Sequence, residues 1–97
     1  MTHETVRLVI SGRVQGVGYR AWLAGRARQL GCTGWVRNRR DGSVEALVHA
    51  PSDMLSALVA DCRQGPAAAR VESVVLAEPA PDELRFIAGD FAVLPTL

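Results

Sequence analysis

The order of strand-like and helix-like patterns restricts the fold of this chain more than any other feature of its sequence. Apolar and polar residues alternate over residues 5–13, which predicts a strand. Over residues 20–30 the apolar side chains recur at i, i+4 and i+7, and Gly31 follows as a stop signal, which predicts a helix. The chain therefore begins with a strand that leads into a helix.

A hairpin and a second helix come next. Residues 35–39 and 44–50 have the composition of strands, and the segment 40–43 between them contains Asp-Gly, a strong hairpin signal. Ser52 is then a candidate N-cap for a helix whose apolar stripe ends before Gly65. These segments predict two antiparallel strands followed by a helix.

The last part of the chain adds strand signals. Residues 71–76 form a β-branched run, which is followed by a break at 79–82 and by a final stretch that contains Phe86, Phe91 and Val93. The order β-α-β-β-α-β predicts an α+β fold of the ferredoxin-like type, with an antiparallel sheet and both helices on one face. The tail is expected to add a short extra strand.

Composition limits the function more than the fold. A chain of 97 residues that is 48% hydrophobic suits a single domain spanning residues 1–97. The formal net charge is only +1, so we expect neither a nucleic acid nor a membrane as a partner. All 11 basic residues are arginines, which excludes lysine nucleophiles and the lysine-containing phosphate loop. Any anion site has to be local.

The few cysteines and histidines predict neither a metal nor a cofactor. Cys32 and Cys62 do not form a C-x-x-C pair, and only His3 and His49 could add ligands. The expected fold separates the two cysteines, so we expect free thiols. Because the sequence shows no leader pattern and no apolar run of about 18 residues, we expect the cytoplasm as its compartment.

A glycine-rich segment, Gly12–Arg20, connects the first strand to the first helix. Gly16 and Gly18 allow successive backbone N–H groups to converge, and a helix N-terminus favours an anion. Arg20 adds a planar fork that matches two phosphate oxygens. This segment could hold a phosphoryl group; alternatively, the glycines serve only a tight connection and Arg20 is solvated.

Two segments carry a resemblance to a known family. Gly12–Arg20 resembles the first acylphosphatase signature, G-x-V-Q-G-V-x-[FY]-R, at every fixed position. Gly34–Val44 resembles the second signature, although Ala50 stands where the family has a final glycine, for which we expect an altered turn and intact chemistry. The break at residues 64–71 is also similar to the family, so the resemblance covers almost the whole chain.

The resemblance implies an enzyme that hydrolyses the carboxyl-phosphate bond of small acyl phosphates, with inorganic phosphate or other oxyanions as product or inhibitor. By this analogy Arg20 and Asn38 are the catalytic residues, and Arg20 holds the phosphoryl group while Asn38 orients the attacking water. We also expect a monomer. The resemblance also implies a phosphate cradle, whose phosphate-binding residues are the backbone of Gln15, Gly16, Val17, Gly18 and Tyr19 together with the side chain of Arg20.

This chemistry needs no histidine or cysteine. An acyl phosphate expels a carboxylate whose conjugate acid has a pKa of about 4, so the leaving group requires little help from a general acid. The reaction does require stabilised charge on the phosphoryl oxygens and a water held in line. An asparagine amide can accept a hydrogen bond from that water but cannot remove its proton. We therefore expect the proton to pass to the substrate phosphate.

Neighbouring polar residues have simpler structural interpretations. His49 could act as a base, but we expect it to face solvent or to pack. Arg37, Arg39 and Arg40 could widen a positive rim, yet a charged hairpin is typically solvated and protects a sheet edge. Asp41 precedes a glycine in a turn, which sufficiently explains its presence.

Three alternative functions stay open. Ferredoxin-like sheets also bind RNA through exposed aromatic side chains, but this chain has five aromatic residues and we expect Trp22 and Trp35 to pack in the core. The family resemblance also extends to carbamoyl-phosphate-handling domains of large hydrogenase-maturation proteins, although this chain is short. A third alternative is an oxyanion binder without turnover. The identity of the acyl group is open as well.

Overall fold

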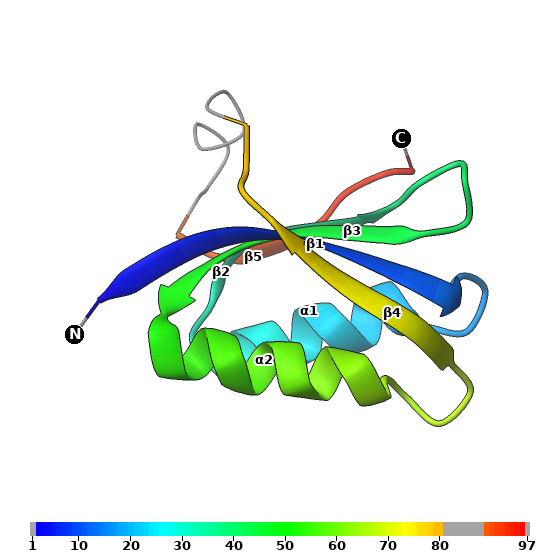
Figure 1. Ribbon diagram of the computed structural model, residues 1–97, viewed down its shortest axis with the longest axis horizontal. Helices are drawn as coiled ribbons and strands as arrows, with labels where there is room; N and C mark the ends of the chain where they lie inside the picture. Colours follow the sequence, from blue (N-terminus) through cyan, green and yellow to red (C-terminus); the bar gives the residue numbers. More distant parts are fainter. Residues whose placement is uncertain (1, 81–88, 97) are drawn as a thin grey trace.

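The chain folds as the predicted ferredoxin-like α+β domain, with both helices on one face of a single sheet (Figure 1). The computed structural model describes residues 2–80 and 89–96. The sheet has the strand order β4-β1-β3-β2-β5. The elements are β1 (His3–Arg13), α1 (Tyr19–Gln29), β2 (Thr33–Asn38), β3 (Val44–Pro51), α2 (Ser52–Gln64), β4 (Arg70–Ala77) and β5 (Phe91–Val93).

The four longer strands pair with one another in antiparallel fashion, as predicted. β3 pairs with both β1 and β2, and β4 pairs with β1. The short C-terminal strand is also confirmed, but it runs parallel to β2 and makes the sheet mixed. Phe91 of β5 is buried in the core, whereas Phe86 lies outside the described residues. Because β5 lies beside β2, the end of the chain comes close to the loop that follows β1.

The helices bury the stripes that the sequence predicts. In α1, Leu23 and Ala27 are fully buried and Leu30 packs at the edge of the core. Leu58 and Cys62 are fully buried on the corresponding face of α2. A hydrophobic core between the sheet and both helices follows from these two stripes. None of the helices in the described residues is long and apolar enough to cross a membrane.

The start of α2 differs from the prediction. Pro51 occupies the N-cap position, and Ser52 is the first helical residue. The Ser52 hydroxyl donates to the Thr2 carbonyl at 3.1 Å instead of capping the helix. Ala50 does not form an altered turn either, since it is a buried residue of β3 opposite Glu4. β3 thus leads directly into α2. No described non-glycine residue has a positive φ, so position 50 does not require a glycine and an alanine fits there.

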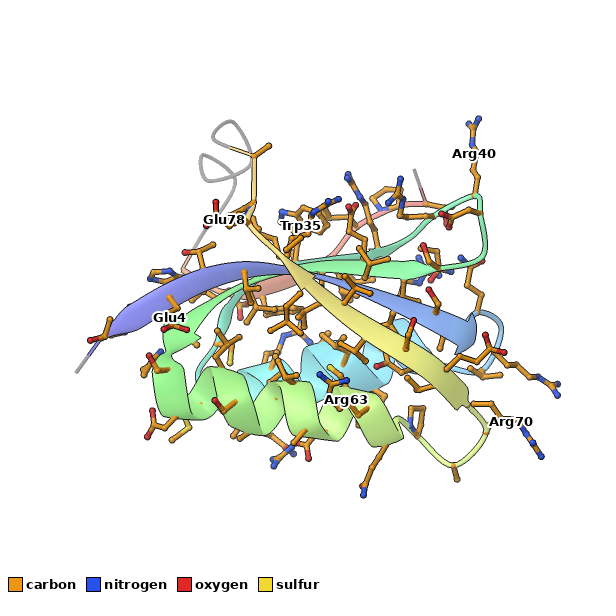
Figure 2. All side chains as sticks on the ribbon, in the orientation of Figure 1. Glu4, Trp35, Arg40, Arg63, Arg70 and Glu78 are labelled. Carbon is orange, nitrogen blue, oxygen red and sulfur yellow. The ribbon has the colours of Figure 1, made fainter. Side chains whose placement is uncertain are left out.

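The face of the sheet opposite the helices contains a second buried cluster. Trp35 is only 4% exposed, which confirms that it is buried, although it lies on this helix-free face and outside the helix-facing cluster (Figure 2). Leu47, its cross-strand neighbour, is fully buried, and so is most of Glu45. Trp22 does pack against the core as predicted. The helix-free face is therefore not an open aromatic platform.

Both cysteines are free, as predicted, and both are buried. Burial raises the pKa of the Cys62 thiol to about 11 and also raises the pKa of Cys32. A thiol with a raised pKa is a weak nucleophile at neutral pH. Neither cysteine lines the cavity described below.

Candidate active site

The segment between β1 and α1 forms one wall of a small cavity. Gly16 and Gly18 have φ values of 73° and 80°, a left-handed conformation that glycine adopts without a steric penalty. Gly18 is the N-cap of α1 and has no side chain with which to cap the helix. The first N–H groups of α1 are therefore available for an anion, and the helix dipole favours one. We call residues 14–18 the cradle loop.

The cavity has a volume of about 260 Å³. It brings the cradle loop together with Arg20 from α1 and Asn38 from β2, which are far apart in the sequence. Figure 1 shows why: the cradle loop and the turn between β2 and β3 lie at the same end of the sheet. The lining residues are Val14, Gln15, Gly16, Gly18, Tyr19, Arg20, Ala21, Asn38 and Val93.

Two residues of the predicted cradle turn their side chains elsewhere. Val17 does not line the cavity and packs against the core. Tyr19 is 1% exposed, and its hydroxyl donates to the Cys62 carbonyl at 2.7 Å. Burial raises the pKa of this phenol, so it stays protonated. A role for Tyr19 at the cavity would therefore come from its backbone, while its side chain ties the start of α1 to the end of α2.

Arg20 is held at the cavity by the C-terminal part of the chain. Its Nη1 donates to the Leu94 carbonyl at 3.4 Å, and the Leu94 N–H in turn donates to the Val36 carbonyl at 2.8 Å. The remaining N–H groups of the guanidinium can face an anion. The sequence analysis did not identify Leu94 or Val93 as neighbours of the site, because only the position of β5 beside β2 brings them there.

Asn38 is the last residue of β2 and lies next to the cavity. Its Oδ1 atom is buried and has no hydrogen-bond partner among residues 2–80 and 89–96. Buried carbonyl oxygens are normally hydrogen-bonded, and an orphan at a cavity indicates a place for a water or a ligand donor. The side chain of Asn38 is thus suited to accept a hydrogen bond from a molecule in the cavity.

The Gln15 side chain binds the neighbouring hairpin. Its Nε2 donates to the carbonyls of Arg39, at 2.6 Å, and Ser43, at 2.8 Å. Both carbonyls belong to the turn between β2 and β3. Gln15 therefore contributes its backbone to the cradle loop and its side chain to the neighbouring hairpin.

The hairpin arginines differ from our expectation. Arg40 is exposed at the tip of the turn, as predicted (Figure 2). Arg37 and Arg39 are half-buried and therefore less solvated than the surface hairpin that the sequence predicts. They turn toward Glu45, which lies opposite Arg37 in the hairpin register. The Asp-Gly turn signal and this register could have predicted the Arg37–Glu45 pair, which the sequence analysis missed.

Glu45 gathers three arginines on the helix-free face. Its carboxylate accepts hydrogen bonds from Arg7 and Arg37, each at 2.8 Å, and Arg39 Nη1 lies 3.8 Å away. The Arg37 guanidinium also lies 4.5 Å from the centre of the Trp35 ring. Burial raises the pKa of the Glu45 carboxyl, but the hydrogen bonds from Arg7 and Arg37 outweigh this effect, so its pKa lies below the ordinary value of 4.5. The ionised cluster joins three strands beside the site.

Replacing Glu45 with glutamine is expected to destabilise the protein by about 1–3 kcal/mol at pH 7, because three partly exposed arginines lose their shared partner. The lowered pKa means that the ionised form stabilises the folded state. This contribution is complete above pH 4.5 and is lost as the pH falls through the lower folded value. Urea denaturation of both proteins from pH 7 to pH 3 should therefore show a difference that shrinks in acid.

Glu78→Gln is the control for this prediction, because Glu78 is an exposed carboxylate (Figure 2). It should leave stability within about 0.5 kcal/mol of the wild type at every pH. A Glu45→Gln variant that is as stable as the wild type at pH 7 would contradict a structural role for the cluster.

The remaining candidates do not reach the cavity. His49 stacks on His3 with ring centroids 5.4 Å apart, and its Nδ1 lies 2.7 Å from the Thr5 hydroxyl. It is near the far end of β3 and is absent from the cavity lining. Asp41 accepts hydrogen bonds from the N–H and the hydroxyl of Ser43, at 2.9 and 2.6 Å, which confirms its turn role. These bonds lower the pKa of Asp41.

Possible metal ligands are scattered. In the part of the chain that the structure describes, no three side chains of His, Cys, Asp or Glu are grouped so that they could hold a metal ion. The prediction that the site uses no cofactor stays a prediction.

Comparisons with known proteins agree with one another. A family model described as Acylphosphatase matches residues 6–93. The chain is 55% identical over 97 residues to an acylphosphatase of Rhodopseudomonas palustris, with 97% of this chain and 98% of the relative covered. The structure of an acylphosphatase from Coxiella burnetii is similar with a TM-score of 0.84 at 30% identity, covering 95% of this chain and 93% of that one. The acylphosphatase from Bacillus subtilis has a TM-score of 0.78 at 29% identity, covering 96% and 99%.

Proposed function

Because this chain belongs to the acylphosphatase family and is an enzyme that hydrolyses acyl phosphates, we propose that Arg20 and the cradle loop bind the phosphoryl group while Asn38 orients the attacking water. One observation carries this proposal. The cavity brings together Arg20, the uncapped start of α1 and Asn38, whose buried Oδ1 has no hydrogen-bond partner within the described part of the chain. These are the groups that an in-line attack of water on phosphorus requires.

The phosphoryl group binds through backbone and guanidinium groups. Gly16 and Gly18 allow the N–H groups of residues 15–19 to converge on a phosphoryl group, and Arg20 offers two further donors in a fixed plane. Its bond to Leu94 limits the freedom of the guanidinium before substrate arrives. Such preorganised donors stabilise charge on the phosphoryl oxygens without reorganising during the reaction.

Asn38 acts on the water and not as a base. Its Oδ1 accepts a hydrogen bond from the water and directs the oxygen lone pair at phosphorus, in line with the carboxylate that leaves. The water forms the new P–O bond as the bond to the carboxylate oxygen breaks, and its proton passes to a phosphoryl oxygen. The leaving carboxylate needs no proton at neutral pH. No residue of the site has to titrate near pH 7.

The same chemistry suggests the partners and setting of the enzyme. We propose small acyl phosphates as substrates, and inorganic phosphate as a product that competes for the cradle loop. The near-neutral charge balance and the buried aromatic side chains of Trp35 and Phe91 support activity without a nucleic acid. We propose that the protein works as a monomer in the cytoplasm.

Replacing Arg20 with alanine is expected to raise the inhibition constant of inorganic phosphate about 10- to 100-fold and to lower turnover as well, because a charge-assisted pair of donors is lost. The measurement is hydrolysis of benzoyl phosphate with phosphate titrated as a competitive inhibitor. Arg40→Ala is the matched control, since Arg40 is an exposed arginine outside the cavity.

The control variant should keep the wild-type inhibition constant to within about twofold, since a distant exposed charge is largely screened. Equal small effects of both substitutions would contradict the role of Arg20. Phosphate binding by a wild type that does not hydrolyse benzoyl phosphate would instead indicate an oxyanion binder without turnover.

A further inference from the structure

Gln15 links the two halves of the proposed site. It stands in the cradle loop, yet its side-chain amide reaches residues 24 and 28 positions further along the chain. An amide group has two N–H donors, and here the two accepting carbonyls are those of Arg39 and Ser43. Gln15 Nε2 is therefore fully used in holding the hairpin and has no N–H left for a phosphoryl group.

The two carbonyls close the turn that directly follows Asn38. The Arg39 N–H donates to the Ser43 carbonyl at 2.9 Å, and the Gly42 N–H donates to the Arg39 carbonyl at 3.1 Å. Each carbonyl thus keeps one backbone donor when the Gln15 bond is removed. The turn itself should survive the loss of Gln15, whereas the direct side-chain connection between the turn and the cradle loop would not.

Asn38 has little other side-chain support. Its Oδ1 has no partner among the described residues, so its position relative to phosphorus depends on where the backbone of the hairpin lies. A misplacement of about 1 Å can cost on the order of 100-fold in rate. A contact that fixes the hairpin against the cradle loop therefore controls turnover without touching the substrate.

We propose that Gln15 is a positioning residue for turnover: its side chain sets the place of Asn38 relative to the phosphoryl group that the cradle loop binds. This role rests on the proposed function of Asn38. It adds to the backbone role in phosphate binding that the family resemblance implies for Gln15, because it predicts an effect of the side chain on kcat with phosphate affinity preserved.

The test uses Gln15→Met, which keeps the length of the side chain and removes its donors. We expect kcat on benzoyl phosphate to fall about 10- to 100-fold while the inhibition constant of inorganic phosphate changes less than about threefold. The thermal midpoint should drop by no more than about 8 °C. Gln29→Met is the matched control, because Gln29 is an exposed glutamine at the end of α1 that accepts a hydrogen bond from Arg26 and does not line the cavity.

A double variant separates this proposal from the function on which it rests. If Gln15 acts through Asn38, Gln15→Met should lower kcat much less in an Asn38→Ala background than in the wild type. If the fold-loss of kcat in the double variant equals the product of the losses in the two single variants, the proposal is overturned. It is also overturned if Gln15→Met weakens phosphate inhibition as much as it lowers kcat. If Asn38→Ala alone leaves kcat unchanged, the proposed function of Asn38 fails, and a loss of kcat in Gln15→Met cannot then pass through it.

Discussion

Asn38→Ala is expected to lower kcat on benzoyl phosphate by about 100- to 1,000-fold, the range for losing one preorganised polar group at a reaction centre. The reason is geometric. The Oδ1 of Asn38 is buried beside the cavity and unpartnered within the described residues, so its removal leaves the water without an acceptor to orient it. Binding of the phosphoryl group relies on Arg20 and on backbone N–H groups, which the substitution does not touch.

The measurement combines kcat, KM and the inhibition constant of inorganic phosphate for each variant. Phosphate inhibition of Asn38→Ala should stay within about threefold of the wild type, because an interaction made only in the transition state affects turnover. Asn38→Asp serves as the contrasting variant. Its carboxylate still accepts a hydrogen bond but repels the phosphoryl oxygens, so both kcat and phosphate affinity should fall.

Two outcomes would contradict this account of Asn38. A loss of phosphate affinity in Asn38→Ala that matches the loss of kcat would make the amide a phosphate ligand and not a guide for water. A wild-type rate that follows an enzyme base with a pKa near 7 would contradict direct proton transfer to the substrate.

Gly34→Ala is expected to destabilise the fold by about 4 kcal/mol, a large part of the 5–15 kcal/mol typical of a small domain. Gly34 has a φ of +135°, which side chains rarely adopt. A Cβ atom there would lie well within 3.0 Å of the Leu47 carbonyl oxygen, a separation that real Cβ atoms essentially never show. This oxygen belongs to the backbone of the adjacent strand β3 and cannot rotate away as a side chain can. β2 and β3 would therefore have to separate.

Gly25→Ala is the matched control for this substitution. Gly25 lies within α1, and a Cβ atom at this site meets no other atom within 4 Å. Alanine should stabilise the helix by about 0.5–1 kcal/mol relative to glycine. Urea denaturation of both variants measures the contrast. If Gly34→Ala were as stable as the wild type, the close approach of Gly34 to Leu47 would not constrain β2 and β3, and the prediction would be wrong.

The placement of Gly34 also bears on activity. It begins the second signature, and Asn38 lies four residues further along the same strand. The clash with Leu47 would therefore shift the strand that ends at the site. The same strand is tied to the hairpin by the pairing of Arg37 with Glu45. Stability and catalysis are thus connected through β2, although Gly34 does not line the cavity.

Much of the fold could be predicted because its signals are local. The alternation over residues 5–13 and the apolar stripes of the two helices depend only on neighbours in sequence. In the structure, apolar side chains from all three segments lie in the core, as these patterns predict. The cap of α2 could not be predicted in this way. Ser52 is a residue type that often caps helices, but its hydroxyl donates a hydrogen bond to the Thr2 carbonyl instead. A nonlocal contact decided the role of that side chain.

Some residues of the candidate site could likewise be predicted from the sequence, whereas others could not. The glycines, Arg20 and Asn38 are visible in the sequence because the two signatures contain them, and the structure brings them to one cavity. The neighbours that support them are not visible. Leu94 reaches Arg20 only because β5 pairs with β2. Gln15 belongs to the predicted backbone cradle, but the sequence does not show that its side-chain amide binds the hairpin.

The sequence by itself thus determined the order of the elements, the family and the candidate site residues, since periodicity, turn chemistry and motif spacing are properties of contiguous residues. Only the tertiary structure decided which partners each side chain takes. Glu45 illustrates the reason: its burial between Arg7 and Arg37 depends on the register of three strands at once. Hydrogen bonds and ion pairs act over a few ångströms in space, and the sequence does not state which distant residues come that close.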